Sequence, residues 1–422
     1  MTMPLSQQSL VDPEVIRCPY PFYAQLHAEA PVHRDAATGF YVISRYADMQ
    51  AIIKDVASFS NIVRLIDSRP QKAPPEAAAI LATGYERPNT LNFSDPPRHA
   101  RYRRLVEKAF TAGRVRELTP YIDDVVRGLI DAMIAAGCDG PDGIDHVGNF
   151  AVPLPCIVIA DQLGVDRADI PQLKTWSDAI LDPIGLVCPP EREIECARQV
   201  VEFQHYFAAR IAERRSAPRD DILSALAAQT EGDDPLSTEE VLNLLEQLLT
   251  GGNDTTTSTL SGAMLLLLEN PGRADRLRAD PSGIRNFVEE ALRMETPVQG
   301  LFRQTLRNVE VGGVPIPKGS VIMLRHGAVN RDPAKFPDPD HFDPERANAG
   351  AHLAFGAGIH FCPGAMLARQ ELVSAFTQLL ARFDRFVLVE GANDFAYRPN
   401  FFLRGLTRLQ VRLRPSPLPP MR

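Results

Sequence analysis

The chain has 422 residues, of which 45% are hydrophobic, so it can bury a large core, and its formal net charge of −8 gives no reason to expect nucleic-acid binding. The N-terminus lacks a basic stretch followed by an apolar segment, and no apolar run approaches the length of a membrane span, which predicts a soluble cytoplasmic protein. The six cysteines form no C-x-x-C pair, and their spacing suggests neither a zinc site nor a disulfide framework.

The hydrophobic patterning favours a mainly α fold with a smaller β-sheet region (α+β), in one domain over residues 1–422. A β-containing part up to about residue 95 precedes a helix-rich remainder, and the two are not independent domains. In chain order, residues 39–44 predict a strand and residues 45–57 a helix. Residues 60–89 are rich in Pro and Ala and have weak periodicity, which predicts a long irregular excursion.

The middle of the chain is predicted to be helical. Asp95 is a capping acid followed by two prolines, which predicts a helix over residues 97–110. Nearly all of residues 119–269 follow helical periodicity with short loops. Ser237 and Glu240 fit a capping box. The helix that they open is predicted to have about 33 residues and a length of roughly 50 Å.

The remaining third alternates helix, strand and irregular chain. Turn residues separate the strands, and prolines with aspartates mark the irregular part. The predicted segments are a helix over residues 284–295, strands within 309–324, irregular chain over 330–346, a glycine-bearing loop over 350–362, a helix over 363–383 and a strand over 409–413.

The glycine-bearing loop carries the strongest chemical signal in the chain. Gly356, Gly358 and Gly364 lie close to Cys362, and glycine allows positive φ and a close backbone approach. Such a loop can turn several N–H groups toward one sulfur, and the helix that follows adds its positive N-terminal end. Both effects lower the pKa of a thiol. A thiolate on haem iron favours O–O cleavage, so we interpret Cys362 as a ligand of haem iron.

With its neighbours, Cys362 resembles the cysteine loop of the cytochrome P-450 family. The family pattern F-x-x-G-x-H-x-C-x-G is met by Phe355, Gly358, His360, Cys362 and Gly364. The resemblance covers nearly the whole chain and implies a triangular prism of helices around a buried haem b, with a long central distal helix. It also implies that Cys362 ligates the iron, that Phe355 and Gly364 belong to the haem site, and that His360 meets a haem propionate.

The long predicted helix contains a second motif. Residues 251–256 read Gly-Gly-Asn-Asp-Thr-Thr, and each glycine costs roughly 1 kcal/mol in a helix interior. Such a locally destabilising segment often marks function. Paired glycines admit a ligand, a threonine hydroxyl can donate to a peroxide, and an acid can relay protons. The segment is similar to the family motif A/G-G-x-D/E-T-T, which implies that Thr255 lies beside dioxygen and that Asp254 begins a proton relay.

A pair of opposite charges lies on the predicted helix before the strand region. Glu290 and Arg293 are at i and i+3, a spacing that alone is usually a solvated pair. The resemblance implies that Arg346, from the irregular chain before the cysteine loop, joins them. Their implied role is to brace the haem-binding core.

Three basic residues match the family positions that hold the haem propionates. His99 and Arg103 are at i and i+4 and share a helix face. Arg303 follows farther along the chain. By the resemblance, all three bind the propionates through charge-assisted hydrogen bonds.

The resemblance also implies a reaction and partners. Dioxygen is cleaved with two electrons and two protons, and one oxygen atom enters the substrate, as in hydroxylation or O-demethylation. The chain has no flavin or iron–sulfur signature, so a ferredoxin and its NAD(P)H-dependent reductase are expected to supply the electrons. We expect a monomer. Candidates for a basic docking patch are Arg101, Arg104, Lys108, Arg114, Arg116 and Arg369.

Family positions further predict the wall of the substrate pocket. The wall is mostly apolar, which favours a hydrophobic small molecule: terpenoid, steroid-like, fatty or aromatic. An acidic substrate would need a cation, for which Arg64 and Arg69 are candidates. The predicted wall residues are Leu248, Gly251, Val298, Leu301, Phe401 and Phe402.

Three alternatives stay open at this point. A peroxide-driven haem-thiolate peroxygenase should lack the Asp254–Thr255 pair, which is present. A non-catalytic haem sensor or carrier would not need Thr255. A thiol enzyme would pair Cys362 with His360, and it would require a third orienting group that the sequence does not provide.

Overall fold

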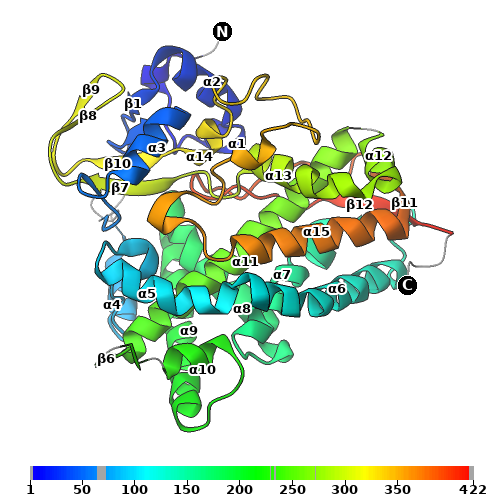
Figure 1. The fold of residues 1–422 in the computed structure, drawn as a ribbon, viewed down its shortest axis with the longest axis horizontal. Coiled ribbons are helices and arrows are strands. Elements are labelled where there is room, and N and C mark those ends of the chain that lie inside the picture. Colours follow the sequence, from blue (N-terminus) through cyan, green and yellow to red (C-terminus); the bar gives the residue numbers. More distant parts are fainter. Residues whose placement is uncertain (1–2, 64–72, 229, 232–233, 271, 418–422) are drawn as a thin grey trace.

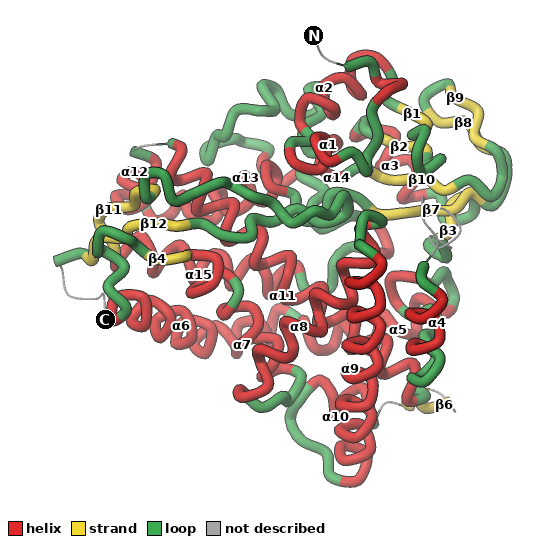
Figure 2. The backbone as a smooth tube through the Cα atoms, turned by 180° about the vertical axis from the view of Figure 1, so that it is seen from behind, coloured by secondary structure: helices red, strands yellow, loops and turns green. Residues whose placement is uncertain are grey.

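The computed structural model describes residues 3–63, 73–228, 230–231, 234–270 and 272–417. Its outline is roughly triangular and narrows toward α10; the strands of the larger sheet lie with α1, α2, α3 and α14 near the N-terminus, and α5 to α11 lie in the rest of the triangle (Figures 1 and 2). Arg64 and Arg69, the candidate cations for an acidic substrate, lie outside the described residues. No helix within the described ranges is long and apolar enough to cross a membrane.

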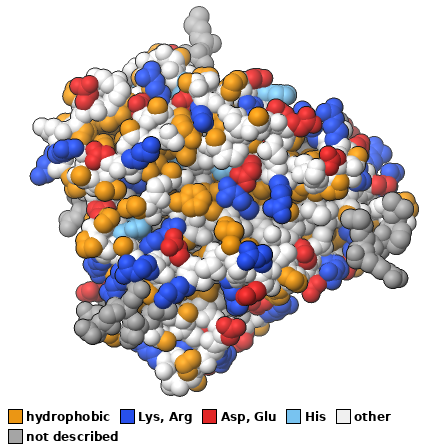
Figure 3. Space-filling view, in the orientation of Figure 1, with side chains coloured by type: hydrophobic (Ala, Val, Ile, Leu, Met, Phe, Trp, Pro, Cys, Tyr) orange, Lys and Arg blue, Asp and Glu red, His pale blue; other side chains and the backbone are white. Residues whose placement is uncertain are grey.

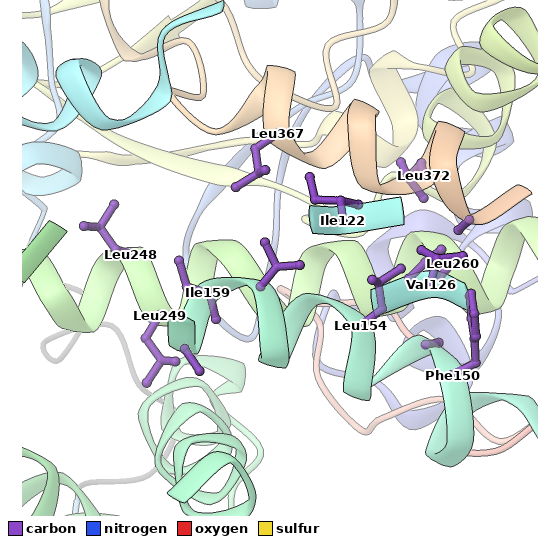
Figure 4. Packing of buried hydrophobic residues seen from close by; sticks show 14 of the residues in the cluster. Ile122, Val126, Phe150, Leu154, Ile159, Leu248, Leu249, Leu260, Leu367 and Leu372 are labelled. Carbon is purple, nitrogen blue, oxygen red and sulfur yellow. The ribbon is translucent and has the colours of Figure 1, made fainter. Parts of the chain in front are cut away.

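The longest helix, α11 (Thr238–Glu269), lies at the centre of the molecule. It begins at the predicted capping box, in which Ser237 accepts from the backbone N–H of Glu240 and the Glu240 side chain accepts from the backbone N–H of Ser237. Most of its side chains are buried, because other helices pack against it on several sides. Figure 4 shows Leu249 and Leu260 of α11 in the main hydrophobic cluster with residues of the neighbouring helices.

The other helices surround α11. Three of them, α7, α8 and α13, contact it most extensively. Their bounds, with those of the remaining helices, are α1 Pro13–Arg17, α2 Tyr20–Glu29, α3 Tyr46–Lys54, α4 Pro75–Leu81, α5 Arg98–Glu107, α6 Ala112–Ala135, α7 Pro153–Gln162, α8 Ile170–Leu181, α9 Pro190–Ser216, α10 Ile222–Ala227, α12 Arg273–Ala279, α13 Ile284–Glu295, α14 His326–Val329 and α15 Ala365–Arg382.

The strands form one larger sheet and three small ones. The five-stranded sheet has the order β1-β2-β10-β7-β3, in which only the β2–β10 pair is parallel. A three-stranded sheet has the order β11-β12-β4, and β5–β6 and β8–β9 are hairpins. The bounds are β1 Val32–Arg34, β2 Tyr41–Ile43, β3 Phe59–Ser60, β4 Ile144–Asp145, β5 Thr230–Glu231, β6 Asp234–Pro235, β7 Leu301–Thr305, β8 Val309–Val311, β9 Val314–Ile316, β10 Val321–Leu324, β11 Phe383–Leu388 and β12 Gln410–Pro415.

The sequence analysis missed three strands of the larger sheet, β1, β7 and the two-residue β3. Strand β1 has only three residues, which is too short for a clear alternation. Strand β7 has two adjacent buried residues, Phe302 and Arg303, so its pattern does not alternate between apolar and polar. The sheet joins segments near residues 40 and 320, so the β-containing part is not confined to the first 95 residues.

Two local predictions were wrong. The predicted excursion over residues 60–89 contains helix α4, which packs on α9 and buries Ala77. Its flanking prolines and its short length conceal the helical period. Asp95 does not cap α5 with its side chain. Its carboxylate accepts instead from the Ser60 hydroxyl and from the backbone N–H of Asn61, at 2.9 Å, and so ties strand β3 to the start of α5.

Candidate functional site

The cysteine loop is a tight turn between the irregular chain and α15. Gly356 and Gly358 have φ values of +67° and +66°, which side chains with a Cβ rarely adopt. A Cβ at Gly358 would also approach the Ile53 side chain to 2.9 Å. The backbone N–H of Cys362 donates to the carbonyl of Phe355 at 2.9 Å and closes the loop. These constraints explain why glycine is required on the N-terminal side of the cysteine.

The Cys362 thiol lies where the loop meets the N-terminus of α15. Burial raises the pKa of the Cys362 thiol, whereas the backbone N–H groups of Gly364 and Ala365 and the charges of Arg103 and Arg369 lower it. Both predicted lowering effects are present, but the net pKa shift of the thiol is upward because desolvation outweighs them. A cation bonded to the sulfur would reverse that balance, since a coordinating thiol is deprotonated.

Helix α5 packs its basic residues against the cysteine loop. The ring centroids of His99 and His360 are 4.1 Å apart, and the Arg103 guanidinium donates to the carbonyl of Phe361. Both histidines have a buried Nε2 without a hydrogen-bond partner. Burial, together with the nearby positive groups, lowers the pKa of His360 to about 3. Arg103 also donates to the Glu107 carboxylate of α5 at 2.6 Å, whereas no described carboxylate accepts from the Nε2 of either histidine.

Two more basic groups reach the same region, one from the sheet and one from helix α14. Arg303 of β7 is buried, its only described hydrogen bond goes to the neighbouring carbonyl of Phe302 at 2.7 Å, and burial lowers its pKa to about 10. His326 of α14 is also buried and has an unpartnered Nδ1. Burial and the charge of Arg303 lower its pKa to about 3. The sequence analysis missed His326, since no local pattern distinguishes it from a core histidine.

These unpaired donors fit the two carboxylates of a haem. Buried polar groups in native proteins are almost always hydrogen-bonded, so several orphaned donors in one place indicate a missing acceptor. Charge-assisted hydrogen bonds from guanidinium and imidazolium groups to carboxylates would satisfy them. The buried nitrogens without a partner belong to His99, His326 and His360. The predicted ligands Arg303 and Arg103 lie beside them, and Arg103 is already paired with Glu107.

The predicted brace is present as a buried network. Glu290 accepts from Arg293 at 2.7 and 2.8 Å and from the Arg346 Nε at 3.0 Å. The exposed fractions of the three side chains are 0%, 0% and 8%. The remaining guanidinium N–H groups donate to backbone carbonyls of residues 330–341. The network therefore fixes the irregular chain that leads into the cysteine loop.

A second ion-pair cluster lies beside the loop. Arg369 of α15 donates to both carboxylate oxygens of Glu289, at 2.6 and 2.9 Å, and lies 4.5 Å from the centre of the Phe355 ring. His352 approaches the same carboxylate at 3.2 Å. Burial opposes ionisation, but Arg369 and His352 lower the pKa of Glu289 to about 2. Arg369 is therefore part of a local brace beside the loop, and its side chain is still 32% exposed.

The two glycines of the distal motif have different surroundings. A Cβ at Gly251 would meet nothing within 4 Å, and this residue is exposed although it lies in the middle of the central helix. A Cβ at Gly252 would lie 3.2 Å from Ile159 of α7. Gly251 thus leaves open space beside α11, whereas Gly252 allows α7 to pack closely against it.

Thr255 and Asp254 face different ways. The Thr255 hydroxyl donates to the carbonyl of Gly251 at 2.8 Å, so it borders the open space. Asp254 is buried, and its carboxylate accepts from the Lys174 ammonium at 3.2 Å and from the Ser177 hydroxyl, both on α8. Acid and alcohol are adjacent in sequence, but no hydrogen bond between their side chains is found among the described residues.

The predicted pocket residues are distributed over several elements. Leu248 belongs to the main hydrophobic cluster, in which Figure 4 shows it at one end. Phe401 is buried in a second cluster, and Phe402 lies beside it with its ring parallel to that of Phe302. Val298 forms a β-bridge with Leu403. These contacts bring the C-terminal turn next to the start of β7, where Leu301 lies half-buried.

The exposed surface near the cysteine loop combines apolar and basic side chains. Ile359, Phe361 and Met366 are exposed at 41%, 39% and 47%. Arg104, Lys108 and Arg116 are exposed on or after α5, while Arg101 and Arg114 approach the carboxylates of Glu240 and Glu117 at 3.8 and 3.5 Å. Figure 3 shows basic side chains over the position of α5 and hydrophobic ones near the middle of this face.

Comparison with known proteins identifies the family. A family model described as Cytochrome P450 matches residues 49–404. The chain therefore belongs to the cytochrome P450 family. As a member it is a monooxygenase, and it has the family's mostly helical fold with small sheet regions.

Characterised relatives cover nearly the whole chain. The chain is 36% identical over 397 residues to Cytochrome P450 107B1 of Saccharopolyspora erythraea. The matched region is 92% of this chain and 94% of that protein. The chain is 37% identical over 403 residues to Cytochrome P450 monooxygenase PikC of Streptomyces venezuelae, with coverages of 94% and 91%. Among solved structures, cytochrome P450 CYP109Q5 from Chondromyces apiculatus has a TM-score of 0.84 and 35% identity, with coverages of 98% and 100%.

Replacing Arg303 with Gln should weaken haem retention. Among the arginines near the unpartnered histidines, Arg303 is the most deeply buried. One hydrogen bond to a charged group contributes about 1.5–3 kcal/mol, so its loss should accelerate haem loss about tenfold or more. Transfer of haem to excess apomyoglobin measures the rate. The matched control is Arg307→Gln in the turn after the same strand, where the side chain is 65% exposed. Equal loss rates in both variants would contradict a propionate role for Arg303.

Replacing Glu290 with Gln should strongly destabilise the protein. The substitution leaves two buried guanidinium groups without their shared charge, and breaking a buried pair costs about 3–5 kcal/mol. Urea unfolding followed by circular dichroism measures the loss. Glu14→Gln removes an exposed i, i+3 partner of Arg17 and should leave the midpoint unchanged. A midpoint for Glu290→Gln that equals this control would refute the bracing role.

Proposed function

We propose that this protein is a haem b-dependent monooxygenase that inserts one oxygen atom from O₂ into a hydrophobic small molecule, with Cys362 as the thiolate ligand of the iron. It works as a monomeric single domain in the cytoplasm and takes its electrons from a ferredoxin and an NAD(P)H-dependent reductase. One observation carries the proposal: a half-buried thiol faced by the backbone N–H groups of Gly364 and Ala365 lies next to several buried basic groups that lack an acceptor.

When bound, haem supplies the iron that activates dioxygen and the oxidising power for the C–H bond. The residues of the chain hold and protect this group. Cys362 would donate its sulfur to the iron, Phe355 with Arg369 packed on its ring would shield the sulfur, and the basic cluster would neutralise the propionates. Glu290 and its two arginines hold the irregular chain that leads into the loop.

The distal residues supply protons. Thr255 borders the open space beside Gly251 and can turn its hydroxyl from the Gly251 carbonyl toward a substrate-side acceptor. Asp254, one residue earlier, can pass protons inward from the surface of α8, where Lys174 is partly exposed. General acid catalysis by such a pair typically contributes about 10²–10⁴-fold to a rate.

The surface near the cysteine loop supports an acidic electron donor. Exposed Ile359, Phe361 and Met366 offer an apolar centre, and exposed Lys108 and Arg116 lie around the nearby end of α5. An apolar centre with a charged rim is typical of transient interfaces, and charge complementarity raises the association rate. The three apolar residues belong to the loop of Cys362 and to the start of α15, so an electron donor docked here would be close to the iron ligand.

The apolar wall supports a hydrophobic substrate. The names of the relatives indicate large or fatty substrates, such as 6-deoxyerythronolide B for a hydroxylase 35% identical to this chain and a hexadecenoyl acyl carrier protein in the structure of P450BioI. Phe402 and Val298 are the partly exposed apolar groups nearest the C-terminal turn. We therefore propose a hydrophobic ligand without a required charge.

A thiol enzyme is the weaker alternative. No hydrogen bond joins His360 and Cys362 within the described part of the chain, and the buried Nε2 of His360 has no partner. The His360 ring lies instead against His99. A base that does not reach the thiol cannot activate it.

The reduced protein with carbon monoxide should show a Soret band strongly shifted to the red, because thiolate ligation donates electron density to the iron. Cys362→Ser should lose this band. Cys18→Ser, a change of an exposed free cysteine, should retain it. A globin-like band in the unmodified protein would refute thiolate ligation by Cys362.

Thr255→Ala should separate electron consumption from product formation. Without the hydroxyl, proton delivery loses a general acid–base contribution, and the ratio of product to NADH consumed should fall about tenfold or more while peroxide rises. Oxygen and peroxide electrodes measure the two fates of the electrons. Thr259→Ala, one helical turn farther along α11, is the control, since its hydroxyl only donates to the Thr255 carbonyl at 2.9 Å. Unchanged coupling in Thr255→Ala would count against the proton relay.

A further inference from the structure

All described partners of the Asp254 carboxylate lie on α8 and in the C-terminal turn. Lys174 contacts Oδ1 at 3.2 Å, Ser177 donates to Oδ2, and a guanidinium nitrogen of Arg398 lies 3.6 Å from Oδ1. The exposed fraction of the Asp254 side chain is only 7%, so these groups largely replace water around it. The carboxylate is therefore held away from Thr255, whose hydroxyl bonds to the helix backbone.

Asp178 completes the cluster. It accepts from both Lys174 and Arg398, each in a short contact, so that two carboxylates and two cations alternate. Arg398 is the only member that comes from outside α8 and α11 among the described residues. Burial disfavours the charge of Arg398, but Asp178 and Asp254 together raise its pKa above the ordinary value. The guanidinium is thus charged and bound to both acids.

Arg398 lies in the turn that carries Phe401 and Phe402. The backbone N–H of Arg398 donates to the Gly405 carbonyl at 3.0 Å, and a β-bridge joins Tyr397 to Leu406. The two sides of residues 397–406 are therefore paired, with the phenylalanines between them. A displacement of one side is passed to the other through these backbone contacts.

Two further contacts stiffen this turn. The Asn400 Oδ1 accepts from the backbone N–H groups of Phe402 and Leu403 at 2.9 and 3.1 Å, and its Nδ2 donates to the carbonyl of Leu181 at the end of α8. A Cβ at Gly405 would collide with the Ser258 hydroxyl, which itself donates to the Asp254 carbonyl at 2.8 Å. The turn is thus seated directly on α11, one helical turn from the acid.

We infer that Arg398 is a positioning residue for Asp254, through which the Phe401–Phe402 turn controls proton delivery. While the turn is at rest, Arg398 and Lys174 hold the carboxylate toward α8. A substrate that displaces Phe402 moves Arg398 and loosens its hold, so that Asp254 turns inward when a substrate is present. This inference rests on the proposed function, because it assigns a control to the same proton relay.

The test uses the haem-loaded full chain and hydrogen peroxide, with the one-electron donor ABTS as the probe. One peroxide and two protons give two waters, while two ABTS molecules each lose one electron. Cleavage of the O–O bond needs the distal acid, so the rate reports on the mobility of Asp254 without a known substrate. Arg398→Gln should raise this rate about fivefold. Arg408→Gln, an exposed arginine on the same C-terminal segment, should leave it unchanged.

Three further variants separate positioning from a structural effect. Arg398→Lys keeps the charge and should restore most of the original rate. Asn400→Ala loosens the turn and should raise the rate as Arg398→Gln does. In an Asp254→Asn background, Arg398→Gln should have no effect. An unchanged or slower rate in Arg398→Gln, no effect of Asn400→Ala, or an effect that persists without Asp254 would each overturn the inference.

The carbon monoxide spectrum distinguishes the two possible failures. If the unmodified protein lacks the red-shifted band, the proposed function fails. If Arg398→Gln retains the band and the solvent isotope effect on its peroxide reaction matches that of the unmodified protein, the site is intact and only the control by Arg398 is refuted. A smaller isotope effect in Arg398→Gln, together with the faster rate, supports it.

Discussion

A single buried carboxylate, Glu290, determines where the cysteine loop can lie. It binds one arginine of its own helix and one from the irregular chain, and both arginines donate to backbone carbonyls of residues 330–341. An irregular segment has no regular backbone hydrogen bonds of its own, so its buried carbonyl groups need donors from other parts of the chain. Two guanidinium groups provide them, and the loop that ends at Cys362 starts from this fixed base.

The loop in turn determines the electrostatics of the centre. The backbone N–H groups of Gly364 and Ala365 face the sulfur, and the His360 ring packs at a tilt against His99 of α5. The result is a region with an unusual excess of buried donors, which is unfavourable until anions are bound. The unsatisfied polar groups therefore lie where a cofactor with two carboxylates fits. Burial in this region lowers the pKa of both His99 and His360.

The sequence predicted the parts of the structure whose residues are close together in the chain. The capping box of α11, the span of α13 and the cysteine loop depend on local spacing, and all three have the predicted form. Strand β7 was missed because tertiary contacts bury Arg303 on what looks like a polar position. His326 and Arg398 were missed for the same reason, since their partners are remote and no motif connects them.

The position of Arg398 shows what the distal motif cannot show by itself. An acid and an alcohol that are adjacent on a helix need not point the same way, and here the acid bonds to α8 while the alcohol bonds to its own backbone. An acid that always faced the open space would deliver protons whether or not a substrate was bound. The ion pairs around Asp254 raise the free energy needed to rotate its carboxylate inward. Arg398 supplies one of these pairs from the C-terminal turn, so movement of the turn would lower that free energy. The same contacts that stabilise the resting enzyme thereby make proton delivery depend on the pocket.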